Sequence, residues 1–217
     1  YDHLSEEGIV TYWLPVYQLS VPESQAILKG FCNVFETCSL WTGADLEWIM
    51  VGVKHPTDPV TEYEFARQWR DPIVGPEMQA LGFEKPEQFG AFFIADGERL
   101  NAWIRDSLPL TDNYPQRLSF HAWNRRIYIN TYLDFMDETL SQTNFMESET
   151  SKKMWPESLH QETAEYFSIR PIINGILAPP KWKRYSSVFY LHQCLHNPTL
   201  KNYFLWILDS DQYAQNI

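Results

Sequence analysis

An uncharged run of residues near the start of the chain constrains the fold more than any other feature of the sequence. Residues 9–15 read Ile-Val-Thr-Tyr-Trp-Leu-Pro and follow Gly8. An unbroken run of β-branched and aromatic residues of this length is typical of a strand buried in a parallel sheet. Pro15 has no backbone N–H to donate to a neighbouring strand. We therefore expect a buried strand that ends at Pro15.

A helix and a pair of strands follow this run. Pro22 suits the first turn of a helix, and apolar residues then recur every three or four positions up to Phe35. Residues 38–42 and 47–53 are two apolar runs on either side of a turn-forming segment. The pattern predicts an α/β domain in which the helix covers the sheet and the last two strands form a terminal antiparallel pair.

The remaining sequence predicts helices. Before residue 120 we expect them from Thr61 onward and at residues 75–81, 86–94 and 97–107, followed by an ordered loop at residues 108–115. Later aromatic-rich patterns predict helices at residues 123–140, 151–167 and 185–208. The sequence thus divides into an α/β part, residues 1–120, and a helical extension, residues 121–217. Because disordered segments are poor in aromatic residues, we expect the extension to pack against the α/β part or a partner chain.

Charge and cysteine content exclude several classes. A net charge of −11 argues against a nucleic-acid partner and is compatible with a cationic ligand, although acidity can also simply keep a protein dispersed. The three cysteines, Cys32, Cys38 and Cys194, are an odd number without zinc-type spacing. We expect neither a disulfide nor a metal site, and a reducing compartment.

The sequence shows neither a signal peptide nor an apolar run near the ~20 residues that cross a bilayer. We expect a cytoplasmic protein, with attachment to the inner face of a membrane as an open alternative.

Several stretches together carry a family resemblance. The run at residues 8–16, Cys-Ser-Leu-Trp-Thr-Gly at 38–43, Trp-Ile-Met-Val-Gly at 48–52 and Pro-Leu-Thr-Asp-Asn-Tyr-Pro at 109–115 resemble the C-terminal half of spermidine synthase-like proteins. The similarity is to the bacterial group in which this domain is often fused to membrane-spanning segments. It implies the C-terminal part of a Rossmann-like sheet of the methyltransferase type. The implied cofactor is S-adenosylmethionine or its decarboxylated form, and the implied reaction is aminopropyl transfer to a polyamine.

The resemblance also implies where the site lies. In the family, the cofactor turn and the catalytic aspartate precede the strand at residues 8–14, and no Gly-x-Gly-x-x-Gly motif occurs in this sequence. No catalytic residue carries over, so we expect the cofactor-binding half on a preceding segment or a partner chain. The residues that match the amine-binding region are Tyr12, Trp13, Tyr17 and Gln18. The family's usual glutamine at the end of the strand is replaced here by Trp13 or shifted to Gln18.

Four further residues are candidates with simpler alternatives. Trp41 and Trp48 could contact a cationic substrate, but cross-strand packing in the predicted hairpin also explains them. Glu47 could bind the same cation or be merely solvated. Asp112 is a candidate for the cofactor pocket, or it caps its own loop.

Two function classes remain open at this stage. The first is an aminopropyl- or methyltransferase of which this chain is the C-terminal part, inactive by itself. The second is a non-catalytic scaffold or accessory subunit of a larger complex, including one with a membrane protein. Nine tryptophans and twelve tyrosines favour extensive contacts in either case, so we expect an oligomer or a complex.

Overall fold

Four strands form one sheet in the computed structural model, which describes residues 1–35, 37–43, 46–56, 59–80, 83–112 and 125–170. The strands are β1 (Ile9–Pro15), β2 (Thr37–Thr42), β3 (Glu47–Val53) and β4 (Phe93–Asp96). Their spatial order is β1-β3-β2-β4, and each neighbouring pair is antiparallel. The expected strands at residues 9–14, 38–42 and 47–53, and the antiparallel pairing of the last two, are confirmed.

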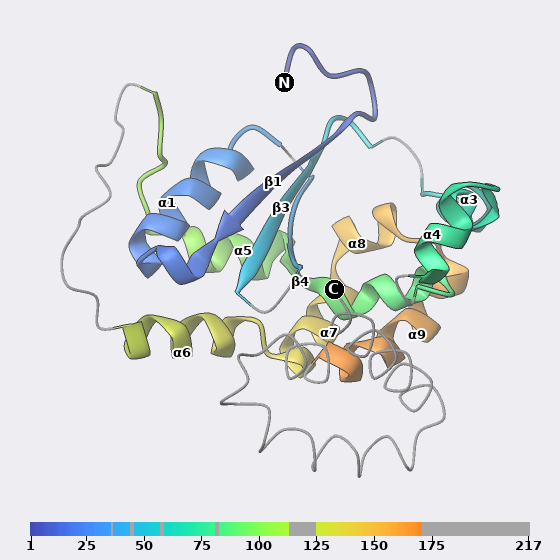
Figure 1. Cartoon of the computed structure of the whole chain (residues 1–217). Helices are drawn as coiled ribbons and strands as arrows, with labels where there is room; N and C mark the ends of the chain where they lie inside the picture. The colour runs from blue at the N-terminus through green and yellow to red at the C-terminus, as the bar shows by residue number, and fades with distance from the viewer. Residues whose placement is uncertain (36, 44–45, 57–58, 81–82, 113–124, 171–217) are drawn as a thin grey trace, which may run out of the picture.

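The helix after β1 is α1 (Val21–Cys32), and it begins at a capping box. The Ser20 backbone N–H and hydroxyl both donate to the Glu23 carboxylate at 2.8 Å. Leu28 is fully buried and belongs to the cluster that packs on the sheet. The expectation that this helix covers the sheet is confirmed (Figure 1).

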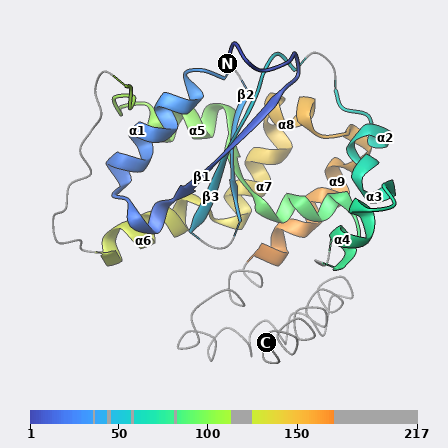
Figure 2. The ribbon, with the colours of Figure 1, turned by 45° about the horizontal axis from the view of Figure 1, so that its top comes forward.

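Helices lie on both sides of the sheet (Figure 2). On one side α1 is joined by α5 (Gly97–Ile104) and α6 (Arg125–Phe135). The other side carries α7 (Glu138–Glu147), α8 (Glu149–Met154), α9 (Glu157–Glu165) and the 3₁₀ segments η2 (Pro86–Phe92) and η3 (Tyr166–Ile169). The shorter elements are η1 (Val16–Gln18), α2 (Glu62–Phe65), α3 (Arg67–Arg70) and α4 (Val74–Ala80).

Each side of the sheet has its own apolar cluster. The cluster on the α1 side includes Leu14, Leu40, Trp48 and Met50 from three strands, together with Tyr132 of α6. The opposite cluster consists of Phe93, Phe145, Trp155, Leu159 and Phe167, with Trp41 packed against it. The neighbouring side chains of Leu40 and Trp41 on β2 pack into opposite clusters, as the pleat of a sheet requires.

The part of the extension that the structure describes is packed rather than separate. Tyr132 and Met136 belong to the cluster on the α1 side, and Phe145, Trp155 and Phe167 belong to the opposite one. The expected packing of aromatic residues in the extension is thus confirmed for residues 125–170, and both clusters combine residues from before and after position 120. The helix expected at residues 185–208 lies outside the described residues.

The expectation of a buried parallel strand at residues 9–15 is wrong. β1 pairs antiparallel with β3, which separates it from β2, and among the described residues no other strand pairs with β1. Tyr12 and Trp13 keep 62% and 55% of their surface exposed. An apolar run has the same composition in a buried strand and in an edge strand, so composition alone cannot separate the two.

The prediction of a helix at residues 86–94 is also wrong at the C-terminal end of that range. Residues 86–92 form η2, and Phe93–Asp96 form β4 beside β2. All four residues of β4 are buried. Such a short run, buried on both faces, carries no periodicity from which a strand could be distinguished from a helix.

The expectation of unpaired cysteines is wrong for two of the three. Cys32 at the end of α1 forms a disulfide with Cys38 of β2. The turn between them places Phe35 over Gly52 of β3, where an added Cβ would lie 2.4 Å from the Phe35 ring. An odd number of cysteines is compatible with one pair, and Cys194 lies outside the described residues.

We expect Phe145→Ala to lower the free energy of unfolding by about 3–5 kcal/mol, because it leaves a cavity in the cluster beside β4. Phe145 is 1% exposed and contacts the rings of Phe93, Trp155 and Phe167. Leu140→Ala on the same helix is the control, since Leu140 is 53% exposed and its loss should cost less than about 0.5 kcal/mol. Urea unfolding of both variants measures the difference. Equal effects would contradict the packing described here.

We expect reduction of the Cys32–Cys38 bond to lower the free energy of unfolding by about 2 kcal/mol, the chain-entropy contribution for a loop this short. The separation of the two cysteines is six residues. Thermal unfolding with and without dithiothreitol measures the effect. A Cys32→Ser/Cys38→Ser double variant should not respond to the reductant; a response of equal size in that variant would show that this pair is not responsible.

Candidate functional site

Four of the residues chosen from the sequence, Trp13, Tyr17, Gln18 and Glu47, lie at or beside the carboxyl end of β1, and a fifth, Tyr12, lies in the middle of the strand. We call Trp13, Tyr17, Gln18 and Glu47 the β1-end cluster. The Trp13 Nε1–H donates to Glu47 Oε2 at 2.5 Å. The Gln18 amide donates to the Tyr17 hydroxyl at 2.9 Å. Side chains alternate along a strand, so Tyr12 points to the opposite face of the sheet from Trp13.

The turn after β1 explains why these polar groups face outward. The turn's apolar residues Val16 and Leu19, together with Leu14 of β1, are buried and anchor the turn in the cluster on the α1 side. The Val16 N–H donates to the Leu46 carbonyl at 3.1 Å, which ties the turn to the start of β3. With the apolar residues turned inward, Tyr17 and Gln18 are left on the surface.

The two tryptophans of the hairpin do not pair with each other. Trp41 is opposite Ile49, and Trp48 is opposite Thr42, so the two indoles lie on opposite faces. The expected cross-strand pairing of Trp41 and Trp48 is wrong by one residue of register.

Packing accounts for both indoles. Trp48 is fully buried and contacts the rings of Trp103 and Tyr132. Trp41 stacks on Trp155, and its Nε1–H donates to the Ser39 hydroxyl at 2.8 Å. Within the described part of the chain, neither indole forms a hydrogen bond with a residue of the β1-end cluster.

Asp112 lies in a different region. The loop before it is fixed to α1, because the Leu110 N–H donates to the Ala26 carbonyl at 2.8 Å. Asp112 itself is exposed, and within the described residues it makes no hydrogen bond to the β1-end cluster. Its assignment to a cofactor pocket remains a prediction.

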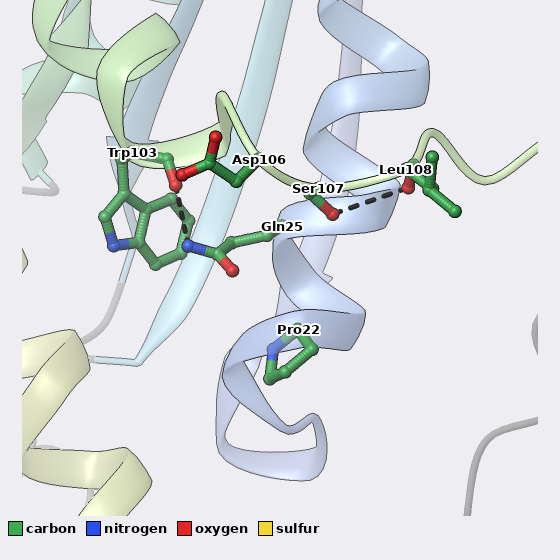
Figure 3. A pocket seen from close by; sticks show the side chains of 6 residues that line it. All are labelled: Pro22, Gln25, Trp103, Asp106, Ser107 and Leu108. Atoms are coloured by element: carbon green, nitrogen blue, oxygen red, sulfur yellow. Dashed lines mark hydrogen bonds between the residues drawn. The ribbon is translucent and has the colours of Figure 1, made fainter.

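A cleft that the sequence did not reveal lies between α1 and the end of α5 (Figure 3). Its volume is about 440 Å³, and it is lined by Pro22, Gln25, Trp103, Asp106, Ser107 and Leu108. The Gln25 amide donates to the Trp103 carbonyl at 2.6 Å across it. The lining comes from two segments, whose residues Gln25 and Trp103 are 78 positions apart in the sequence, and the sequence carries no local motif that joins them. One carboxylate and one indole would suit a small cation, but Asp106 is exposed.

A buried carboxylate lies where β4 meets α5. Asp96 is fully buried and accepts a hydrogen bond from the Ser151 hydroxyl at 2.7 Å. The Asp96 N–H donates to Asn144 Oδ1 at 2.9 Å. Burial raises the pKa of Asp96, and the hydrogen bonds from Ser148, Ser151 and Asn144 oppose that rise. These contacts tie α7 and α8 to β4, so we assign Asp96 a structural role.

A half-buried guanidinium, that of Arg99, and a buried one, that of Arg170, complete this polar layer. Arg99 donates to the carbonyls of Ile94 and Phe135, and Arg170 donates to those of Met136 and Phe93. Both also donate to the Ser141 hydroxyl, at 3.3 and 2.9 Å. Burial lowers the pKa of Arg170 to about 9, so the group still carries its charge at neutral pH. The two side chains hold the end of α6 and the start of α7 against β4.

The described residues show neither a metal-binding cluster nor a helix that could span a membrane. They contain no group of three His, Cys, Asp or Glu side chains that could hold a metal ion. Among the same residues, no helix has both the length and the apolar character to cross a membrane.

Comparison with protein-family models, with curated proteins and with solved structures finds no match to this chain.

We expect the stabilising effect of Asp96 to fall as pH rises from its ordinary pKa of 3.8 toward its raised value. In that window the unfolded chain has released the proton while the folded protein still holds it, so the free energy of unfolding decreases with pH. Urea unfolding of the parent and of Asp96→Asn across pH 3.5–7 measures the difference between them, in which other groups cancel. The difference should decline with pH, and a flat or rising one would contradict the raised pKa.

Proposed function

We propose that this chain is the amine-binding part of a larger S-adenosyl-dependent transferase, which moves an aminopropyl or methyl group to a cationic amine. The observation that carries the proposal is the β1-end cluster at the end of a sheet in which β3 lies reversed between β1 and β2. A terminal antiparallel pair after a strand and a covering helix is what the resemblance to spermidine synthase-like proteins implies. The sheet order therefore supports a Rossmann-like methyltransferase-type fold for the larger protein.

The β1-end cluster suits one end of a polyamine. The rings of Trp13 and Tyr17 are partly exposed, and an ammonium over such a ring gains roughly 0.5–1 kcal/mol. Glu47 supplies a carboxylate for a charge-assisted hydrogen bond, and the Trp13 N–H holds it in place. This arrangement binds and orients a cation without supplying a reacting group.

The described residues do not fit the S-adenosyl cofactor. They contain no Gly-rich turn between a strand and a helix N-terminus, and α1 instead begins at Ser20 and Pro22. The sequence has no Gly-x-Gly-x-x-Gly motif. We assign the cofactor to a segment or partner chain outside residues 1–170 and derive no step of the transfer from this chain.

A non-catalytic scaffold is the second candidate. The exposed apolar residues of β1, including Ile9 and Tyr12, favour it because exposed apolar surface marks contact with another protein segment. A membrane-protein partner, with the chain at the inner face of the membrane, belongs to this alternative. Catalysis by the natural gene product separates the two candidates.

In the natural gene product that contains residues 1–217, we expect Trp13→Ala and Glu47→Gln each to raise the KM for the amine about 3- to 10-fold. Each removes roughly 0.7–1.4 kcal/mol of binding and no reacting group, so kcat should change little. The assay supplies S-adenosylmethionine or its decarboxylated form with putrescine or spermidine. Tyr63→Ala is the control, because Tyr63 is an exposed aromatic residue on α2.

The same assay can reject the proposal. Absence of transfer with every pair of substrates would favour the scaffold. Transfer with an unchanged KM in both cluster variants would show that the amine binds elsewhere, with the cleft beside Asp106 as the next candidate.

A further inference from the structure

Fixed contacts shape the cleft between α1 and the end of α5 (Figure 3). The Gln25 amide donates to the Trp103 carbonyl at 2.6 Å. The loop after α5 lies directly on α1, because a Cβ added at Gly30 would come within 2.5 Å of the Leu110 carbonyl oxygen. The Leu110 N–H also donates to the Ala26 carbonyl at 2.8 Å. The cleft is therefore preformed, and its volume of about 440 Å³ is in the usual range of ligand sites, roughly 300–1,000 Å³.

The polar groups that line the cleft are mostly acceptors. Within the described residues, the Asp106 carboxylate and the Gln25 Oε1 accept no hydrogen bond. The donors are fewer, because the Gln25 amide N–H is already used and Pro22 has no backbone N–H. The Ser107 hydroxyl donates to the carbonyl of the next residue at 3.4 Å. No lysine or arginine is among the described lining residues, so the cleft favours a ligand that donates hydrogen bonds over an anion.

Apolar groups form the rest of the lining. Trp103 is half-buried, and its indole is held in place by stacking on Phe135, with the ring centres 4.4 Å apart. Pro22 and Leu108 complete the apolar lining, and Leu108 is 75% exposed. A hydrocarbon group in the cleft would remove this apolar surface from water. Figure 3 shows the indole near the Asp106 carboxylate, so one ligand could contact both.

We propose that this cleft binds a small organic ammonium compound, with its nitrogen at the Asp106 carboxylate and the Gln25 Oε1 and its hydrocarbon part against the Trp103 indole. Because Asp106 is exposed, its ion pair alone is weak, and the other two contacts supply the remaining affinity. An inorganic cation fits less well, because Ca²⁺ and Mg²⁺ need about six oxygen ligands and the cleft offers one carboxylate. The cleft shares no residue with the β1-end cluster, so this site does not depend on the proposed function.

Titration of residues 1–217 with benzylamine tests the site, because this probe is charged at neutral pH and carries one aromatic ring. Nuclear magnetic resonance of the ¹⁵N-labelled protein follows the Gln25 side-chain amide and the backbone amides of Ser107 and Leu108. These signals should shift together, with a dissociation constant on the order of 1 mM for so small a probe. Benzyl alcohol, which has the same ring without the charge, should bind about tenfold more weakly.

A pair of variants isolates the charge of Asp106. Asp106→Asn keeps the shape of the side chain and should weaken benzylamine binding about tenfold. Glu98→Gln is the matched control, because Glu98 is an exposed carboxylate at the start of the same helix and its loss changes the net charge equally. The control should leave the dissociation constant unchanged. Equal effects of the two variants would show a response to net charge alone and would overturn the proposal.

Two results with the parent chain would also overturn it. One is equal binding of benzyl alcohol and benzylamine. The other is the absence of any shift at the cleft when benzylamine is present well above the expected dissociation constant, which includes the case in which another part of the chain fills the cleft.

The same spectra separate this site from the proposed function, because the Trp13 indole N–H reports on the β1-end cluster. Shifts confined to Trp13 would place the ammonium at that cluster and refute the cleft site. Shifts at the cleft that persist in Trp13→Ala would show that the cleft binds by itself. Transfer activity of the natural gene product is measured separately, so its absence together with benzylamine binding at the cleft rejects the proposed function and leaves this site intact.

Discussion

The rest of the structure depends on the burial of the sheet from both sides. This burial differs from strand to strand. β4 is buried throughout and β2 nearly so, because helices cover both faces at these strands. β1 at the far side keeps most of its residues exposed. On the covered side, backbone carbonyl groups need hydrogen-bond donors. Arg99 and Arg170 supply these donors where α6 and α7 meet β4. A buried guanidinium is stable only while its hydrogen bonds are kept, so these contacts fix one packing of the helices.

The sequence predicts elements well where a local pattern is strong. The strand at residues 9–15, the capped helix after it and the strand pair around Trp41 and Trp48 all have a clear period or a turn signal. It fails where the answer depends on distant residues. β4 is a strand because β2 lies beside it, the edge position of β1 depends on the order of the whole sheet, and the Cys32–Cys38 pair depends on where α1 ends.

The candidate site also divides into features that a local sequence pattern predicts and features that depend on distant residues. A strand end is visible in sequence, so Trp13 could be placed near the end of β1 and the adjacent residues Tyr17 and Gln18 in the turn after it. The position of Glu47 beside the strand end follows from the antiparallel pair. The faces of Trp41 and Trp48 could not be predicted, because a shift of one residue in register reverses the face of each side chain. The cleft at Trp103 and Asp106 arises only when α5 packs against α1. The β1-end cluster lies beside β1, the most exposed strand of the sheet.

We propose that this chain is one part of a cofactor-binding sheet and that residues outside it hold the cofactor. Calorimetric titration of S-adenosylmethionine and of its decarboxylated form into residues 1–217 tests the claim most directly, with the natural gene product as the reference. We expect no binding by the chain alone at micromolar ligand, and binding by the gene product. Micromolar binding by residues 1–217 alone would contradict it.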